Sequence, residues 1–328
     1  MKTGFQHTLS FGMTVLCLGF ALVTGSVNSA WAQKPGAGKA GGRDEILTTK
    51  DGWKLHATYF PSSDGKESPV VIMLPATDGP DAKDARTRKV WEKTALELQS
   101  NGFAALSLDL RKHGDSTSGP SAGTKPTAVP GTLRLAPNDY VLMATEDLEV
   151  AKEFLMKEHE SQRLNIARTG ILSAGSSSMV SVAFSAADWI KPPFQDAPIP
   201  SAGQEDKRTP RGQDVRALMM LTPHFTVKGL NSLAALKSVD NLPIAVHVLV
   251  AAEDKDGVRD GERVFKAVKK KGDEYKDVRL MTQAPVSAKA EGFLEGKAAE
   301  PCNKLILEFM TKNLKGPSIP WKSRKSRL

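Results

Sequence analysis

The sequence predicts an α/β fold in which a mostly parallel sheet is covered by helices on both of its faces. Two observations carry this prediction. Short apolar runs alternate along the chain with longer segments whose apolar residues recur every three or four positions, the pattern of strands alternating with helices. Several runs are continuously apolar, as expected of strands that are buried on both faces. Parallel strands need crossover connections, and the intervening helices supply them.

Eight strands are predicted, and the first two form an antiparallel pair joined by the hairpin dipeptide Asp51–Gly52. The third is continuously apolar and is stopped by Pro75, as expected of a central strand. Most of the later strands are separated by helical segments, so they should pair in parallel. The predicted strands cover residues 45–49, 54–60, 69–74, 103–109, 169–172, 215–221, 244–252 and 278–283.

The predicted helices are amphipathic, which is typical of helices that cover a sheet. The first places Trp91, Ala95 and Leu98 at helical spacing on one side. In the last helix Cys302 joins the apolar side, so we interpret it as a core residue rather than a reactive thiol. The predicted helices cover residues 86–100, 139–159, 180–187, 231–237, 260–270 and 301–314.

Residues 1–32 predict a secretory signal peptide. Lys2 supplies a positive charge, residues 9–25 are apolar, and Ala-Trp-Ala at residues 30–32 matches an A-x-A cleavage site. Cleavage near Ala32–Gln33 would export the protein to the periplasm, the cell envelope or the medium, and retention as an anchor is the alternative. The exported chain would keep Cys302 as its one cysteine, so it could form no internal disulfide.

Two segments differ in composition from the predicted domain at residues 44–314, which is long enough to bury its own core. Residues 33–43 are rich in Gly, Ala and Lys and predict a flexible linker. Residues 315–328 form a basic tail that contributes to the formal net charge of +8. This tail is either a solvated chain end or a contact for an anionic envelope polymer.

The stretch at residues 173–179, Ser-Ala-Gly-Ser-Ser-Ser-Met, links a predicted strand to a predicted helix. Its first six residues are all tiny. A strand, a tight turn of tiny residues and a helix form the setting in which a Gly-x-Ser-x-Gly motif presents a nucleophilic serine. The motif itself is altered here, because serines stand where its glycines would be.

Three motifs, in this order along the chain, resemble the α/β-hydrolase superfamily. Asp-Leu-Arg-Lys-His-Gly-Asp-Ser at residues 109–116 resembles the D-x-R-G-H-G-x-S loop after the fourth strand of that family. Residues 173–179 resemble its nucleophile turn, and Ala-Ala-Glu-Asp at residues 251–254 resembles the G-x-x-D loop that carries its triad acid. The resemblance spans residues 44–314 and implies a dienelactone hydrolase-like or serine aminopeptidase-like branch with a minimal lid.

The resemblance leaves two candidates for the position of the nucleophile. Aligned without gaps, Gly175 takes that position. A shift of one residue makes Ser176 the nucleophile, with tiny residues two positions away on either side. Ser177 is disfavoured, because Met179 would then occupy a flank that needs a tiny residue.

The other implied site residues form an incomplete set. The resemblance implies that Thr77 and Ser176 supply the oxyanion-hole N–H groups and that Asp254 is the triad acid. The triad histidine should follow the last strand, but residues 284–297 contain none, and Glu291 falls at about its position. A carboxylate with an ordinary pKa of ~4.3 is a poor base for a hydroxyl at neutral pH. His224, after the sixth strand, is the candidate for an unorthodox base.

Two functions follow from this pattern. The first is an exported protein of the α/β-hydrolase family that has lost its triad and acts by binding a small ligand or as an envelope component. The second is a weak serine esterase or peptidase that uses Ser176, Asp254 and an unorthodox base on an ester or peptide substrate. We expect no cofactor and no metal, since no cluster has metal-ligand spacing. We expect no nucleic-acid partner, because the lysine run at residues 269–271 has no interleaved aromatic residues.

Overall fold

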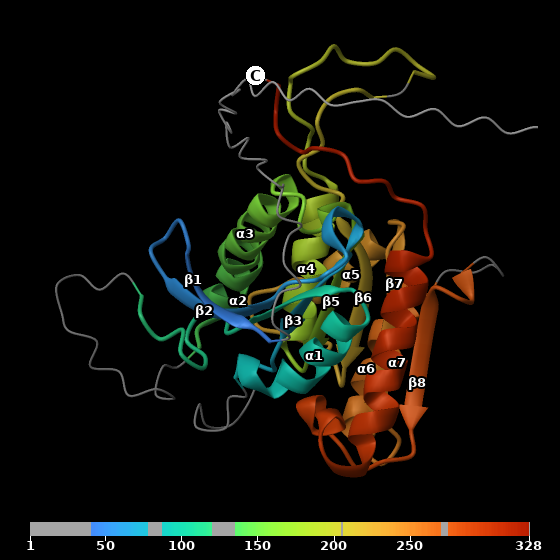
Figure 1. Cartoon of the computed structure of the whole chain (residues 1–328). Helices are drawn as coiled ribbons and strands as arrows, with labels where there is room; N and C mark the ends of the chain where they lie inside the picture. The colour runs from blue at the N-terminus through green and yellow to red at the C-terminus, as the bar shows by residue number, and fades with distance from the viewer. Residues whose placement is uncertain (1–40, 78–86, 120–134, 205, 270–274, 328) are drawn as a thin grey trace, which may run out of the picture. The chain divides into compact units, whose positions relative to one another are not determined.

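A computed structural model describes residues 41–77, 87–119, 135–204, 206–269 and 275–327. Within these residues eight strands form one sheet in the order β1-β2-β4-β3-β5-β6-β7-β8 (Figure 1). The β1–β2 and β2–β4 pairs are antiparallel, and the remaining neighbours are parallel. The strands are β1 (Arg43–Thr48), β2 (Lys54–Phe60), β3 (Val70–Leu74), β4 (Ala104–Leu108), β5 (Thr169–Ala174), β6 (Val215–Leu221), β7 (Ala245–Ala251) and β8 (Arg279–Ala284).

Helices cover both faces of the sheet (Figure 1). The apolar side chains of α1 and α7 belong to one buried cluster, and those of α3, α4, α5 and α6 belong to a second. The helices are α1 (Glu92–Ser100), α2 (Pro137–Leu142), α3 (Leu148–Glu160), α4 (Ser177–Trp189), α5 (Ser232–Asp240), α6 (Lys255–Val268) and α7 (Ala299–Met310). The predicted α/β fold, with a mostly parallel eight-stranded sheet and helices on both faces, is confirmed.

The central strand β3 shows how the sequence sets this arrangement. Val70, Ile72 and Leu74 point to the cluster on the α3–α6 side, whereas Val71 and Met73 point to the cluster on the α1–α7 side. All five side chains are at most 1% exposed. Successive side chains of a strand alternate between faces, so a strand covered on both sides must be apolar at every position.

One helix predicted as continuous is interrupted. The sequence predicts a single helix at residues 139–159, whereas the structure has α2 and α3 joined by a π-helical turn at Met143–Asp147. The turn ends at the fully buried Asp147, whose Oδ1 accepts hydrogen bonds from Nε and Nη2 of Arg111 at 2.8 and 2.7 Å. The π-helix is rare in proteins and occurs mostly as single turns inside α-helices, as it does here.

Helix α6 begins five residues before its predicted start at residue 260. Gly257 and Gly261 weaken the helical pattern of its first turns, which is why the sequence did not indicate them. Close packing explains both glycines. A Cβ atom at Gly257 would lie 2.5 Å from Oδ2 of Asp254, and one at Gly261 would lie 2.7 Å from Cγ1 of Val250.

All described residues belong to one unit, Ala37–Leu328. The predicted signal peptide at residues 1–32 and most of the predicted linker at residues 33–43 lie outside the described residues. Among the described helices, none has both the length and the apolar character to cross a membrane.

The carboxyl-terminal segment at residues 316–327 packs against the body of the protein. Nε1 of Trp321 donates to the carbonyl of His159 at 3.2 Å, and the two rings lie 5.0 Å apart. The guanidinium of Arg324 is buried against Asp214, with Nη1 2.6 Å from Oδ1. The tail is therefore held to the body at Trp321 and Arg324, although most of its other residues are exposed.

Candidate functional site

The loops that follow the parallel strands converge at one edge of the sheet, which is where α/β folds place their sites. The turn after β5 is the sharpest of them. Gly175 has a φ of +53°, in the left-handed region, directly between the last residue of β5 and the start of α4. Its N–H donates to the carbonyl of Leu221 at 3.0 Å, which ties the tip of the turn to the end of β6. Glycine adopts this backbone conformation without the steric cost that a side chain brings.

Ser176 follows the tip of the turn and already has helical backbone angles, with φ −67° and ψ −26°. Its side chain is largely buried, since the residue is 5% exposed. Its Oγ lies 3.4 Å from Nδ1 of His224, at the long end of hydrogen bonding. The structure thus brings together two of the residues that the sequence singled out. It gives the left-handed backbone position to Gly175 rather than to Ser176.

The neighbouring serines are fully buried within the turn and the helix. The hydroxyl of Ser177 donates to the carbonyl of Ala174 at 2.7 Å. The hydroxyl of Ser173 lies 3.1 Å from that of Ser181. The Ser177 hydroxyl is engaged by the backbone and the Ser173 hydroxyl by Ser181, so neither is available to a substrate.

The loop after β6 positions His224. Its backbone N–H donates to the carbonyl of Gly175 at 3.3 Å, so the loop is joined directly to the nucleophile turn. The next residue, Phe225, donates its N–H to Oδ2 of Asp260 at 3.2 Å, and the guanidinium of Arg263 lies 3.9 Å above its ring. Two side chains of α6 therefore fix the backbone that carries the imidazole.

The oxyanion loop after β3 meets the loop after β8. The N–H of Ala76 donates to Oε1 of Glu291, which is 2% exposed. Thr77, the predicted oxyanion residue, is 5% exposed, and its Oγ1 has no hydrogen-bond partner in the described structure. The donor is the backbone N–H of Ala76, so nothing in the sequence indicated this contact. The carboxyl group of Glu291 therefore binds the residue immediately before Thr77, the predicted oxyanion-hole donor.

Asp254, the predicted triad acid, is oriented by a different partner. Nζ of Lys289 lies 3.1 Å from its Oδ1, so the acid loop after β7 is bound to the loop after β8. A cavity of about 310 Å³ lies here, lined by residues 253–256 and 287–289. In addition, Ala290 donates its N–H to Oγ1 of Thr222 at 3.2 Å, which connects the β8 loop to the loop that holds His224. Lys289 was not singled out from the sequence, because charged loop residues carry no periodic pattern.

No group of three or more His, Cys, Asp or Glu side chains in the described part of the chain is arranged to hold a metal ion. Cys302 is 3% exposed, and burial raises the pKa of its thiol to about 12. The thiol is thus protonated at neutral pH, and the interpretation of Cys302 as a core residue agrees with its packing in α7.

The strand order, the parallel crossovers and the sharp turn after β5 together define the α/β-hydrolase fold. No protein-family model matches the chain, and no curated protein matches its sequence. Solved structures do match, among them a dienelactone hydrolase from Anabaena variabilis, with 14% identity and a TM-score of 0.55 over 83% of this chain and 99% of that one. An esterase from Pyrococcus furiosus matches with 13% identity and a TM-score of 0.53 over 83% of this chain and 91% of that one.

An acylaminoacyl peptidase from Pyrococcus horikoshii has the same fold over part of its length. It is 14% identical, with a TM-score of 0.55, over 86% of this chain and 43% of that one. At these identities the likeness establishes the scaffold, which these proteins share with our chain. Activity depends on site residues rather than on the scaffold.

Proposed function

We propose that this chain is an exported protein with an α/β-hydrolase scaffold that binds a small ligand at the β5 turn without hydrolysing it. One observation carries the proposal: the left-handed tip of the turn is occupied by Gly175, with a φ of +53°. A nucleophile elbow holds its serine at this strained tip so that the hydroxyl is presented to the substrate. Glycine offers no atom that could attack a carbonyl.

The surroundings of the turn support the same conclusion. Glu291 follows β8, where a triad histidine would be expected, and its carboxyl accepts the N–H of Ala76. A carboxyl group held there is a weak base and also competes for a donor in the loop that would receive an oxyanion. Both effects disfavour acyl transfer, while the fold still brings the loops after the parallel strands together at one edge.

A second candidate function rests on a different observation. The 3.4 Å contact between Oγ of Ser176 and Nδ1 of His224 joins a hydroxyl to a potential base, which is the minimal pair for a serine hydrolase. We infer that any hydrolysis by this chain would use that pair on an ester or peptide. Hydrolases that lose a triad member retain roughly 10³–10⁴-fold acceleration over water, so such activity would be weak.

Labelling with a fluorophosphonate separates the two functions. Under the binding proposal, the wild-type protein and the Ser176→Ala and His224→Ala variants remain unlabelled, and p-nitrophenyl acetate is hydrolysed at the rate of buffer. Labelling of the wild-type protein that disappears in both variants would overturn the binding proposal in favour of the weak hydrolase. Ser161→Ala, an exposed serine on the far end of α3, is the matched control and should change neither readout.

Ligand binding at the turn can be tested with a thiol in place of the Ser176 hydroxyl. In a Ser176→Cys variant of the mature chain, residues 33–328, the introduced thiol is the reporter, because Cys17 is absent and Cys302 is buried and protonated. A small ester or carboxylate that raises the melting temperature should also slow alkylation of the introduced cysteine. Stabilising compounds that leave the alkylation rate unchanged would show that they bind elsewhere and would contradict a ligand site at this turn.

Export belongs to the proposal because of residues 1–32, whose sequence has the charge, apolar run and A-x-A pattern of a signal peptide. The protein recovered from a bacterial envelope or medium fraction should begin at Gln33. A full-length cytoplasmic product that retains Met1 would contradict export.

A further inference from the structure

A second cavity lies at the opposite edge of the sheet from the Gly175 turn. Its volume is about 660 Å³, within the range of small-ligand pockets. Ala167, which precedes β5, and Arg216, at the start of β6, form its floor, so it lies at the amino ends of the parallel strands. Its walls come from the irregular segment at residues 191–213 and from the carboxyl-terminal segment at residues 318–327. Figure 1 shows these two segments, in olive and red, running side by side above the sheet.

The lining of this cavity is strongly basic. Seven of its residues are Lys or Arg, against a single acid, Asp206. The basic residues are Lys191, Lys207, Arg208, Arg216, Lys322, Arg324 and Arg327. Acids pair with four of them: Lys191 with Glu149, Arg208 with Asp206, Arg324 with Asp214 and Arg327 with Asp196. Positive charge still dominates the lining, so the cavity attracts an anion.

Internal contacts hold the two walls in place. Arg324 donates to the carbonyls of Pro210 and Gly212 at 3.0 and 2.9 Å, in addition to its pairing with Asp214. Arg327 donates its N–H to Oδ2 of Asp196 at 3.2 Å. The tail is thus fastened to the facing segment at two points, and the cavity between them exists before any ligand binds. Preformed sites of this kind lose little entropy on binding.

Arg216 supplies a partly desolvated cation at the floor. Its Nε donates to the carbonyl of Ala167 at 3.3 Å, and its guanidinium lies 4.7 Å above the ring of Trp189. Burial lowers the pKa of Arg216, although the nearby carboxylates act in the opposite direction. The carboxylate of Asp214 is already paired with two other cations, Arg324 and Lys152. An anionic ligand would compensate the charge of Arg216 directly.

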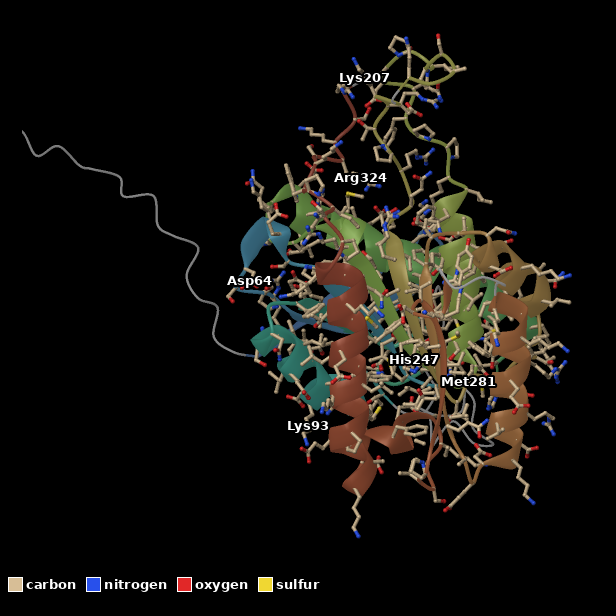
Figure 2. The ribbon with its side chains drawn as sticks, turned by 90° about the vertical axis from the view of Figure 1, so that its right-hand side faces the viewer. Asp64, Lys93, Lys207, His247, Met281 and Arg324 are labelled. Atoms are coloured by element: carbon tan, nitrogen blue, oxygen red, sulfur yellow. The ribbon has the colours of Figure 1, made fainter. Side chains whose placement is uncertain are left out.

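We propose that this cavity binds a ligand bearing several phosphate groups. Guanidinium groups donate in a fork that fits phosphate oxygens, and lysines add compact positive charge beside them. Lys207 and Lys322 are exposed on the two facing walls, where they can contact such a ligand from both sides. Figure 2 shows Lys207 and Arg324 together in the upper part of the view, with Lys93 of α1 well away from both.

Calorimetric titration of the full mature chain with sodium tripolyphosphate tests the site. We expect saturable binding that weakens as salt is raised, since exposed charges are screened. Substitution of Lys207→Gln together with Lys322→Gln should raise the Kd at least about tenfold, which corresponds to roughly 1.4 kcal/mol. The control, Lys93→Gln with Lys297→Gln, removes the same charge from exposed lysines at a distance and should leave the Kd within about twofold of wild type.

Equal loss of affinity in the two double variants would overturn the proposal, because it would reduce binding to overall charge. Undetectable binding of tripolyphosphate by the wild-type protein would overturn it as well. Co-sedimentation with vesicles containing phosphatidylglycerol distinguishes the two sources of phosphate. Vesicle binding that needs Lys207 and Lys322 indicates a lipid headgroup, and binding of tripolyphosphate alone indicates a soluble ligand. The outcome does not depend on whether Ser176 reacts, since the two sites lie at opposite edges of the sheet.

Discussion

The guanidinium of Arg324 binds the carboxylate of Asp214 through two hydrogen bonds, Nη1 to Oδ1 at 2.6 Å and Nη2 to Oδ2 at 3.2 Å. Asp214 immediately precedes β6, so this pair ties the carboxyl-terminal segment to the edge of the sheet. Nζ of Lys152 lies 2.7 Å from the same carboxylate and also contacts Asp188. Burial alone would lower the pKa of Lys152, but the two carboxylates raise it overall, so the ammonium stays charged within the cluster.

Arg324→Ala should lower the free energy of unfolding by about 3 kcal/mol, the lower end of what removing one partner of a buried ion pair costs. The cost is limited because Lys152 still compensates Asp214. Urea denaturation measures the change, and Lys325→Ala is the control because that lysine is adjacent and exposed. Equal stability of the two variants would show that the tail does not contribute to the fold.

His247 should make stability depend on pH. It lies in the middle of β7 and is 2% exposed (labelled in Figure 2), with Nε2 2.9 Å from Oγ1 of Thr282. Burial lowers its pKa from 6.5 to about 4, so the unfolded chain binds more protons than the folded chain between these values. Stability contributed by neutral His247 is therefore complete above pH 6.5 and is lost as the pH falls towards 4.

The size of this effect follows from the shift. Between pH 7 and pH 5 we expect the wild-type protein to lose about 2 kcal/mol through His247. A His247→Leu variant should lack that component, so its free energy of unfolding should fall less over the same interval. Urea titrations at the two pH values measure the difference. If the free energy of unfolding fell equally in the wild-type protein and in His247→Leu, groups other than His247 would cause the acid sensitivity.

Much of the fold could be predicted because its signals are local. The predicted strands at residues 54–60 and 215–221 coincide with β2 and β6, since continuous or alternating apolar residues determine where a strand is buried. The burial of Cys302 followed from its place in an apolar pattern. The order of the motifs along the chain then fixed which loops would share one edge of the sheet.

Contacts between distant charged residues could not be predicted. Arg324 and Asp214 are 110 positions apart, and nothing in the local sequence of either indicates the other. The basic tail accordingly left two alternatives open. The same limit applied within the candidate site. Asp254 was indicated by the resemblance of residues 251–254 to the acid loop of the α/β hydrolases, but its pairing with Lys289 depends on how two irregular loops fold back on each other.

The loop that holds His224 should be sensitive to a single methyl group at Gly229. Gly229 has a φ of +88°, and a Cβ atom there would lie 2.0 Å from the carbonyl oxygen of Pro137, at the start of α2. Gly203 has a comparable φ of +84°, but nothing lies within 4 Å of its added Cβ. Gly203→Ala therefore reproduces the backbone strain without the collision.

Gly229→Ala should lower the free energy of unfolding by at least about 1 kcal/mol more than Gly203→Ala, because positive φ costs both variants about equally. Thermal denaturation, with the two variants measured side by side, gives the difference. Indistinguishable melting temperatures would mean that the loop moves away from α2 at little cost.

Restoring a nucleophile and a base should create labelling that neither change creates alone. Gly175→Ser places a hydroxyl at the left-handed tip of the turn, where φ is +53°. Glu291→His supplies an imidazole in the loop after β8 and removes the carboxyl group that binds the N–H of Ala76, next to the predicted oxyanion-hole donor Thr77. The double variant should react with a fluorophosphonate at least about tenfold faster than either single variant, since nucleophile and base act as a unit.

Two controls make this experiment decisive. Gly203→Ser, combined with Glu291→His, puts a serine at another left-handed glycine and should stay unlabelled. Circular dichroism and the melting temperature establish that each variant is folded, since a serine at positive φ costs about 1–3 kcal/mol. A folded Gly175→Ser/Glu291→His protein that labels no faster than its single variants would show that these two positions do not face a common substrate. That result would contradict the interpretation of Gly175 as the tip of a former nucleophile turn.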